Sequence, residues 1–132
     1  MKTCPSSNPI LIIDDETSIL NLIEKILSRN GYPVETAASG EEGLRKIENN
    51  EYSLILTDIQ MAGISGVQVL DYLRNKIKKS TPVVGMSGTP WLLDQRNFDA
   101  VLPKPYRIKE LLEVINHFTE KTISNHIIED PP

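Results

Sequence analysis

Three aspartates follow two short apolar segments of the chain, at positions where the end of a strand would present them together. Asp14 and Asp15 come after Ile10 to Ile13, and Asp58 comes after Leu54 to Thr57. Carboxylates held close together repel one another and shift their pKa values unless a cation compensates them. Mg2+ is typically bound by one or two carboxylates together with phosphate oxygens and waters. The trio therefore predicts a magnesium site that is open to a phosphate group.

Two further polar residues follow later apolar segments. Ser87 ends the segment that starts at Val83, and Lys104 comes shortly after Ala100 to Leu102. A carboxylate can attack phosphorus to form an acyl phosphate, and hydrogen-bond donors and cations around the phosphoryl oxygens stabilise that transfer. These residue types favour phosphoryl transfer, with Asp58 as the nucleophile and with Ser87 and Lys104 as the groups that contact the phosphoryl oxygens.

These residues can act together only if the fold brings them to one place, and the predicted elements do so. Five apolar segments alternate with amphipathic stretches, two of which begin with capping boxes at Ser39 and Ser65. The alternation predicts an α/β fold, a doubly wound five-stranded parallel sheet of flavodoxin-like type with strand order 2-1-3-4-5. In such a sheet the carboxyl ends of the strands share one edge, where ligands bind. The residues expected to converge at that edge are Asp14, Asp15, Asp58, Ser87 and Lys104.

The later helices are expected to differ in length. Thr89 and Pro90 have the residue types of an N-cap and a first helical position, but little chain follows them, so we expect a shortened fourth helix of about two turns. A longer last helix is predicted from the helical spacing of apolar residues between Ile108 and Phe118. The expected organisation is a disordered leader over residues 1–8, one folded domain over 9–123 and a frayed tail over 124–132.

Length and composition exclude several classes of protein. A chain of 132 residues fits one domain. The formal charge of -4 gives no basic face for nucleic acid. The only cysteine, Cys4, leaves no disulfide framework and indicates a reducing compartment, and no secretory or membrane-spanning segment is predicted. We therefore expect a cytoplasmic protein that binds neither nucleic acid nor membranes directly.

With these residues in view, the sequence resembles the receiver domain of two-component response regulators from Ile10 to about Phe118. The positions that carry the resemblance are Asp14-Asp15, Asp58 with Met61 and Gly66 downstream, Ser87-Gly88 and Lys104-Pro105. The resemblance implies that Asp58 accepts a phosphoryl group from a phosphohistidine on a sensor histidine kinase or a histidine phosphotransfer protein. It further implies a switch rather than an enzyme acting on other substrates.

The resemblance also implies a role for each residue of the pocket. The implied Mg2+ ligands are Asp15 and Asp58 directly, Asp14 largely through water, and the backbone carbonyl of Gln60. Ser87 and Lys104 would sense the phosphoryl group. Because the sequence leaves no room for a second folded unit, we expect a stand-alone receiver whose output is binding to a downstream protein.

The sequence departs from the pattern of the resembled family in three places. Ala62 stands where family members usually have proline after the methionine, which bears on the stiffness of that loop. Val101 stands where the family commonly has an aromatic switch residue, three positions before the lysine. Sixteen residues separate Ser87 from Lys104, several fewer than is usual, which again predicts a short fourth helix.

Two other functions fit part of the pattern. A receiver that acts as a phosphate-independent scaffold would explain Val101 and the short helix, although the complete set of polar residues argues against it. A phosphatase similar to the haloacid dehalogenases would also use an aspartyl nucleophile after a strand. Those enzymes need a second acid two positions later, and this chain has Gln60 there, so a general acid is missing.

Overall fold

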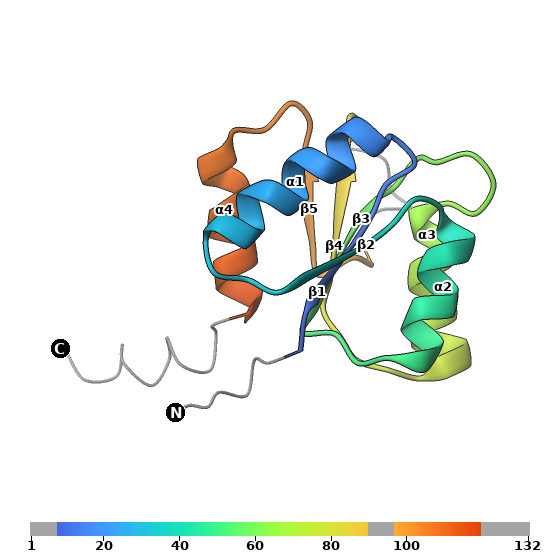
Figure 1. The fold of residues 1–132 in the computed structure, drawn as a ribbon. Helices are drawn as coiled ribbons and strands as arrows, with labels where there is room; N and C mark the ends of the chain where they lie inside the picture. The colour runs from blue at the N-terminus through green and yellow to red at the C-terminus, as the bar shows by residue number, and fades with distance from the viewer. Residues whose placement is uncertain (1–7, 90–96, 120–132) are drawn as a thin grey trace, which may run out of the picture.

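The sheet has the predicted strands in the predicted order. In the computed structural model, which describes residues 8–89 and 97–119, five parallel strands form one sheet with the order β2-β1-β3-β4-β5 (Figure 1). The strands are β1 (Ile10–Ile13), β2 (Val34–Ala37), β3 (Leu54–Asp58), β4 (Val83–Ser87) and β5 (Ala100–Pro103). The fold class expected from the sequence is thereby confirmed.

The helices cover both faces of this sheet. Helices α1 (Thr17–Arg29) and α4 (Ile108–Thr119) lie on one face, and α2 (Gly40–Asn49) and α3 (Gly66–Asp71) lie on the other (Figure 1). The chain of α3 continues as a π-helical turn, η2 (Tyr72–Ile77), which ends at Lys78 in a left-handed conformation with φ of 64°. Because a parallel sheet is covered on both faces, its central strands can be apolar throughout.

Strand β1 shows how the sequence produces the two layers of the core. All four of its residues are buried. Ile10 and Ile12 pack with α1 and α4, whereas Leu11 and Ile13 pack with the helices on the opposite face. Successive side chains of a strand point to opposite faces, so a fully apolar strand contributes to both layers. β1 and β3 therefore anchor the centre of the sheet, and their carboxyl ends lie side by side.

Local signals in the sequence set the starts of two helices. Ser65 accepts a hydrogen bond from the backbone N–H of Gln68, and the Gln68 side chain accepts one from the Ser65 N–H, which completes the predicted capping box of α3. Ser39 caps α2 in the same way, but the return bond differs from the prediction. The Glu42 carboxylate accepts from the N–H of Ala38, one residue before the N-cap.

The helices differ from the sequence-based expectations in some details. The helix that starts at the Ser65 capping box changes to π-helical geometry at Tyr72. Ile108, the first of the apolar residues at helical spacing in the predicted last helix, is 55% exposed. The short fourth helix predicted after Thr89, and most of the predicted leader and tail, lie outside the described residues. Among residues 8–89 and 97–119, no helix is long and apolar enough to cross a membrane.

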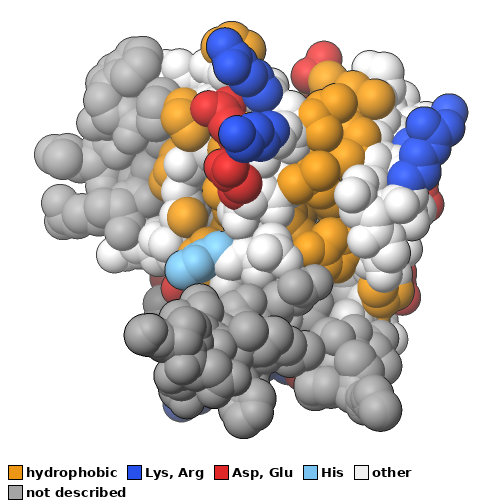
Figure 2. All heavy atoms as spheres, turned by 90° about the vertical axis from the view of Figure 1, so that its left-hand side faces the viewer, with side chains coloured by type: hydrophobic (Ala, Val, Ile, Leu, Met, Phe, Trp, Pro, Cys, Tyr) orange, Lys and Arg blue, Asp and Glu red, His pale blue; other side chains and the backbone are white. Residues whose placement is uncertain are grey.

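The exposed Ile108 belongs to an apolar groove, which we call the α1–α4 groove. It has a volume of about 460 Å³ and is lined by Ile19, Leu22 and Ile26 of α1 and by Lys104, Tyr106 and Ile108 near the start of α4. Leu22 is 54% exposed there. Figure 2 shows a band of hydrophobic side chains on this side of the molecule, next to charged ones.

Candidate functional site: a carboxylate pocket at the edge of the sheet

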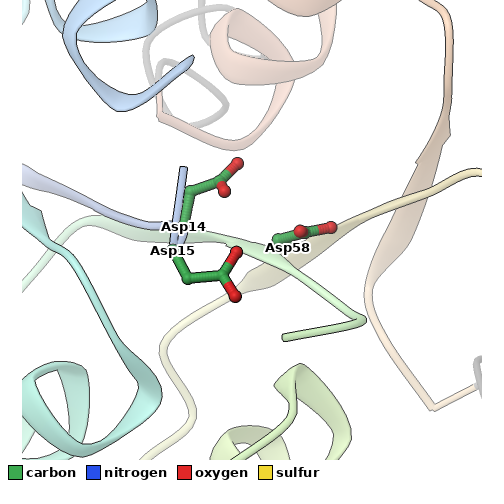
Figure 3. Close-up of side chains that lie close together, drawn as sticks. All are labelled: Asp14, Asp15 and Asp58. Atoms are coloured by element: carbon green, nitrogen blue, oxygen red, sulfur yellow. The ribbon is translucent and has the colours of Figure 1, made fainter. Parts of the chain in front are cut away.

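The three predicted aspartates meet at the carboxyl end of the sheet. β1 and β3 are paired in parallel with Ile13 opposite Thr57, so the residues that follow, Asp14 and Asp58, are brought side by side. Asp15 is the next residue along the chain. One carboxylate oxygen from each aspartate lies within 4.8 Å of the others (Figure 3). The convergence expected from the strand order is therefore present in the structure.

Each of these carboxylates accepts at least one hydrogen bond from the protein. Asp14 Oδ1 accepts from the backbone N–H of Glu16 at 2.9 Å, and Asp15 Oδ2 accepts from the backbone N–H of Ala62 at 3.1 Å. Asp58 Oδ1 accepts from Lys104 Nζ at 3.0 Å. The N-cap of α1 is Glu16, so neither Asp14 nor Asp15 takes the helix-capping role that these residue types could also have filled.

The charges in the pocket are only partly compensated. Asp14 is fully buried and Asp58 is 6% exposed. Burial raises the pKa of Asp14 above its ordinary value of 3.8; the Glu16 N–H opposes this and the charge of Asp58 adds to it. Burial also raises the pKa of Asp58, against the hydrogen bond and charge of Lys104. Among residues 8–89 and 97–119, the Lys104 ammonium is the one cation bonded to these three carboxylates.

The donor set fits a hard divalent cation. Asp14 Oδ2 is buried and has no hydrogen-bond partner among the described residues. Buried polar atoms are almost always paired, and one without a partner points to a bound ion or water. Carboxylate oxygens around a solvent-accessible centre are the ligands that Mg2+ prefers. The pocket residues therefore fit Mg2+, whereas the predicted ligand role of the Gln60 carbonyl stays a prediction.

Ser87 and Lys104 are delivered to the same edge by β4 and β5. Ser87 is buried, and its Oγ accepts a hydrogen bond from the N–H of Thr89 at 2.9 Å. The N–H of Lys104 donates to the Ser87 carbonyl at 2.8 Å, which fixes the two residues relative to each other. Ser87 Oγ also lies 3.4 Å from Thr89 Oγ1, where either hydroxyl can be the donor. When Thr89 Oγ1 donates, the single hydrogen of the Ser87 hydroxyl is available to a group in the pocket.

The loop after Asp58 packs tightly beneath the pocket. The N–H of Gly66 donates to the Ile59 carbonyl at 2.9 Å. A Cβ at position 66 would lie 2.5 Å from the Asp58 carbonyl oxygen and 2.8 Å from Ile59 Cα. Only glycine allows this approach, so Gly66 brings the start of α3 up to the backbone of Asp58.

Three groups at the site were not predicted from the sequence. Two of them are the backbone N–H groups of Glu16 and Ala62, which carry no sequence signal. The third group is Tyr106, whose hydroxyl donates to Met86 Sδ at 3.5 Å. Burial raises the pKa of Tyr106, and the charges of Asp14 and Asp58 raise it further, so its ring lies within electrostatic reach of the pocket.

A protein-family model and a curated protein both match most of this chain. A family model described as "Response regulator receiver domain" matches residues 10–116. The alkaline phosphatase synthesis transcriptional regulatory protein PhoP of Bacillus subtilis is 33% identical over 107 residues, which cover 77% of this chain and 44% of that protein.

Two solved structures match over nearly their whole length. The response regulator TrrA of Thermotoga maritima, in complex with Mg2+ and BeF, has a TM-score of 0.77 and 32% identity, with coverage of 84% of this chain and 98% of that chain. A CheY-like receiver domain protein of Methanospirillum hungatei has a TM-score of 0.81 and 32% identity, with coverage of 89% and 98%. By contrast, the chain spans about half or less of the length of the curated relatives that it matches.

Proposed function

Because this chain belongs to the receiver-domain family of response regulators, we propose that it is a phosphorylation switch in which Asp58 accepts a phosphoryl group from a phosphohistidine. The observation that carries the proposal is the contact between Lys104 Nζ and Asp58 Oδ1, in a pocket where two further carboxylates lie within reach of one cation. This arrangement provides a nucleophile, a metal-binding acid pair and a mobile positive charge.

In this proposal Asp14, Asp15 and Asp58 hold Mg2+, together with the backbone carbonyl of Gln60. When bound, the metal supplies positive charge that offsets the carboxylates and the oxygens of an incoming phosphoryl group. The unpaired Asp14 Oδ2 supports a site of this kind. Asp15 is exposed, so it lies where solvent and a phosphodonor can reach the pocket.

The transfer is a displacement at phosphorus. A carboxylate oxygen of Asp58 forms a bond to phosphorus while the phosphorus–nitrogen bond of the phosphohistidine breaks, and the imidazole nitrogen keeps the electron pair and takes up a proton. Lys104 then follows the phosphoryl group, because its ammonium is a point charge on a flexible stem. The Ser87 hydroxyl donates to a phosphoryl oxygen.

The donor is proposed to be a sensor histidine kinase or a histidine phosphotransfer protein. It must place its histidine against Asp58, so its docking surface must adjoin the pocket. The α1–α4 groove meets this condition because Lys104, the partner of Asp58, also lines the groove. We propose that an apolar helix face of the donor occupies this groove. Output would follow by binding of a downstream protein.

A phosphodonor assay tests the proposal directly. The purified protein is incubated with acetyl phosphate, with Mg2+ or with EDTA, and its intact mass is measured. We expect one added phosphoryl group with Mg2+ and none with EDTA. Asp58→Asn is expected to remove the added mass, because the amide is a poor nucleophile toward phosphorus. Stoichiometric labelling of the Asp58→Asn protein would refute the assignment of the acceptor.

A further inference from the structure

A buried contact among three residues lies beneath the backbone that follows Asp58. Ile59 and Phe98 are both buried in the core layer on the α2 and α3 side of the sheet. A Cβ built on Gly85 of β4 would lie 2.6 Å from Ile59 Cδ1 and 3.2 Å from Phe98 Cδ1. The two side chains therefore fill the space over the backbone of Gly85.

We propose that Phe98 is a positioning residue for phosphoryl transfer: its ring holds the Ile59 side chain over Gly85, and the backbone of Ile59 in turn holds Asp58. The inference rests on the proposed function, since it assumes that Asp58 accepts a phosphoryl group. It assigns a role in the transfer to a side chain outside the pocket of acids, Ser87 and Lys104.

The backbone of Ile59 connects this contact to Asp58. The Ile59 N–H donates to the Met86 carbonyl at 3.0 Å, and the Ile59 carbonyl accepts from the N–H of Gly66 at 2.9 Å. Burial raises the pKa of Asp58, Lys104 opposes this most strongly, and a hydrogen bond from the Ile59 N–H opposes it as well. A shift of Ile59 would therefore move a donor away from the Asp58 carboxylate.

Glycine at position 85 makes Ile59 dependent on its neighbour. A buried strand residue normally contributes a side chain to the core, but glycine contributes none. The space over Gly85 is filled by residues from elsewhere in the chain, Ile59 and Phe98. Because protein interiors are close-packed, a smaller side chain at position 98 would leave room into which Ile59 can turn. The Phe98 ring thus limits the positions that Ile59 can take.

Phe98 is itself fixed by the residue that follows it. The N–H of Asp99 donates to the Val83 carbonyl at 2.9 Å, and Asp99 Oδ2 accepts from the Val83 N–H at 2.7 Å. The same oxygen accepts from Arg74 Nη2 at 2.9 Å. Strand β4 and the π-helical turn η2 therefore hold the backbone next to Phe98, so its ring forms a fixed wall beside Ile59.

The first experiment compares the wild type with Phe98→Leu and Tyr52→Leu. Tyr52 is a matched control, because it is a buried aromatic residue of the same core layer but precedes β3, at the end of the strand opposite Asp58. The rate of labelling by acetyl phosphate is measured by intact mass at saturating Mg2+, at a temperature where circular dichroism shows all three proteins folded.

Phe98→Leu and its control should differ in this rate. A small displacement of the reacting groups slows a reaction strongly, so we expect labelling of Phe98→Leu to be about tenfold slower and that of Tyr52→Leu to stay within about twofold of the wild type. A purely structural role of Phe98 would change the stability of the variant but not the rate in the folded protein. Equal rates for the two variants would overturn the proposal.

A second experiment tests whether the ring acts through Ile59. Gly85→Ala places a methyl group where Ile59 lies, so Ile59 has to turn. This substitution is made in the wild type and in Phe98→Leu, because residues in contact show non-additive effects. We expect Gly85→Ala to slow labelling by a smaller factor in Phe98→Leu, where the shorter side chain leaves room for Ile59. Equal factors in the two backgrounds would rule out the route through Ile59 and overturn the proposal.

A third measurement observes Phe98 with its ring intact. The chain has two phenylalanines, and the other, Phe118, packs on the opposite face of the sheet. Labelling with ring-13C phenylalanine therefore gives NMR signals from these two residues alone, and Phe118→Leu assigns them. We expect Mg2+ with beryllofluoride, which stands in for the phosphoryl group, to shift the Phe98 signals more than those of Phe118. A Phe98 shift no larger than that of Phe118 would contradict the proposal.

Failure of this inference is distinguishable from failure of the proposed function. If the wild type is labelled at Asp58 but Phe98→Leu reacts as fast as Tyr52→Leu, only the role of Phe98 is wrong. If the wild type is not labelled at Asp58 in the presence of Mg2+, Asp58 is not the acceptor and both proposals fall.

Discussion

Among individual residues, Asp14 is the clearest sign that the pocket is adapted to a ligand rather than to stability. Its side chain is fully buried, one carboxylate oxygen is unpaired among the described residues, and two other carboxylates lie nearby. Burying a charge without full compensation destabilises a folded protein. The metal-free protein therefore carries an energetic penalty in its functional site.

Replacement of this charge should stabilise the metal-free protein. Asp14→Asn keeps an oxygen that can accept from the Glu16 N–H but removes the charge. In EDTA at pH 7 we expect the free energy of unfolding to rise by about 1 kcal/mol. Magnesium binding should weaken at the same time.

The advantage of Asp14→Asn should depend on pH. The folded-state pKa of Asp14 is raised above its ordinary value of 3.8. Between pH 3.8 and the raised pKa of the folded state, the folded protein holds the Asp14 proton more tightly than the unfolded chain does. The free energy of unfolding of the wild type therefore falls as the pH rises through this range. The difference between variant and wild type should therefore shrink as the pH is lowered from 7 toward 4. Urea unfolding in EDTA between pH 7 and pH 4 measures the free energy of unfolding of both proteins. A difference that does not change with pH would contradict the raised pKa of Asp14.

Among the elements, the junction between β3 and α3 controls the position of Asp58. Gly66 is packed against the Asp58 carbonyl, so the start of α3 and the nucleophile cannot move independently. A Cβ in that contact would force backbone atoms apart, because neither contacting atom is the end of a flexible side chain.

Gly66→Ala is expected to destabilise the protein by about 2 kcal/mol. Gly88→Ala is the matched control, since a Cβ there would meet none of the described residues within 4 Å. Gly88→Ala should change the free energy of unfolding by no more than about 0.5 kcal/mol. Denaturant unfolding of both variants provides the comparison, and equal losses would show that the contact under Asp58 is not tight.

The α1–α4 groove allows docking of a protein phosphodonor to be tested separately from phosphoryl transfer to Asp58. Leu22 is 54% exposed and lines the groove, whereas the three pocket carboxylates are not among its lining residues. Leu22→Glu should leave labelling by acetyl phosphate intact but slow transfer from a phosphorylated phosphotransfer protein about tenfold, since loss of one apolar anchor costs about 1.4 kcal/mol. Ser28→Glu adds the same charge to α1 outside the groove and serves as the control. Equal transfer rates for the two variants would exclude the groove as the docking surface.

For the molecule as a whole, the sequence was sufficient to predict the sheet and the meeting of the aspartates. Apolar segments that end in polar residues define both the strands and the chemistry, so the order 2-1-3-4-5 places Asp14 beside Asp58 without further information. The donors at Glu16 and Ala62 could not be predicted, because every non-proline residue has a backbone N–H. Helical spacing likewise could not distinguish a buried Ile108 from one that lines a groove.

The assembly of the pocket also has a consequence for how the chain folds. The acids come from β1 and β3, at the centre of the sheet, whereas the compensating ammonium follows β5 at its edge. A partly folded chain in which β5 has not yet docked would gather like charges with no counter-charge, which makes such an intermediate unfavourable. Electrostatic repulsion in the functional site thus disfavours half-formed structures, and the domain is expected to fold and unfold in one cooperative transition.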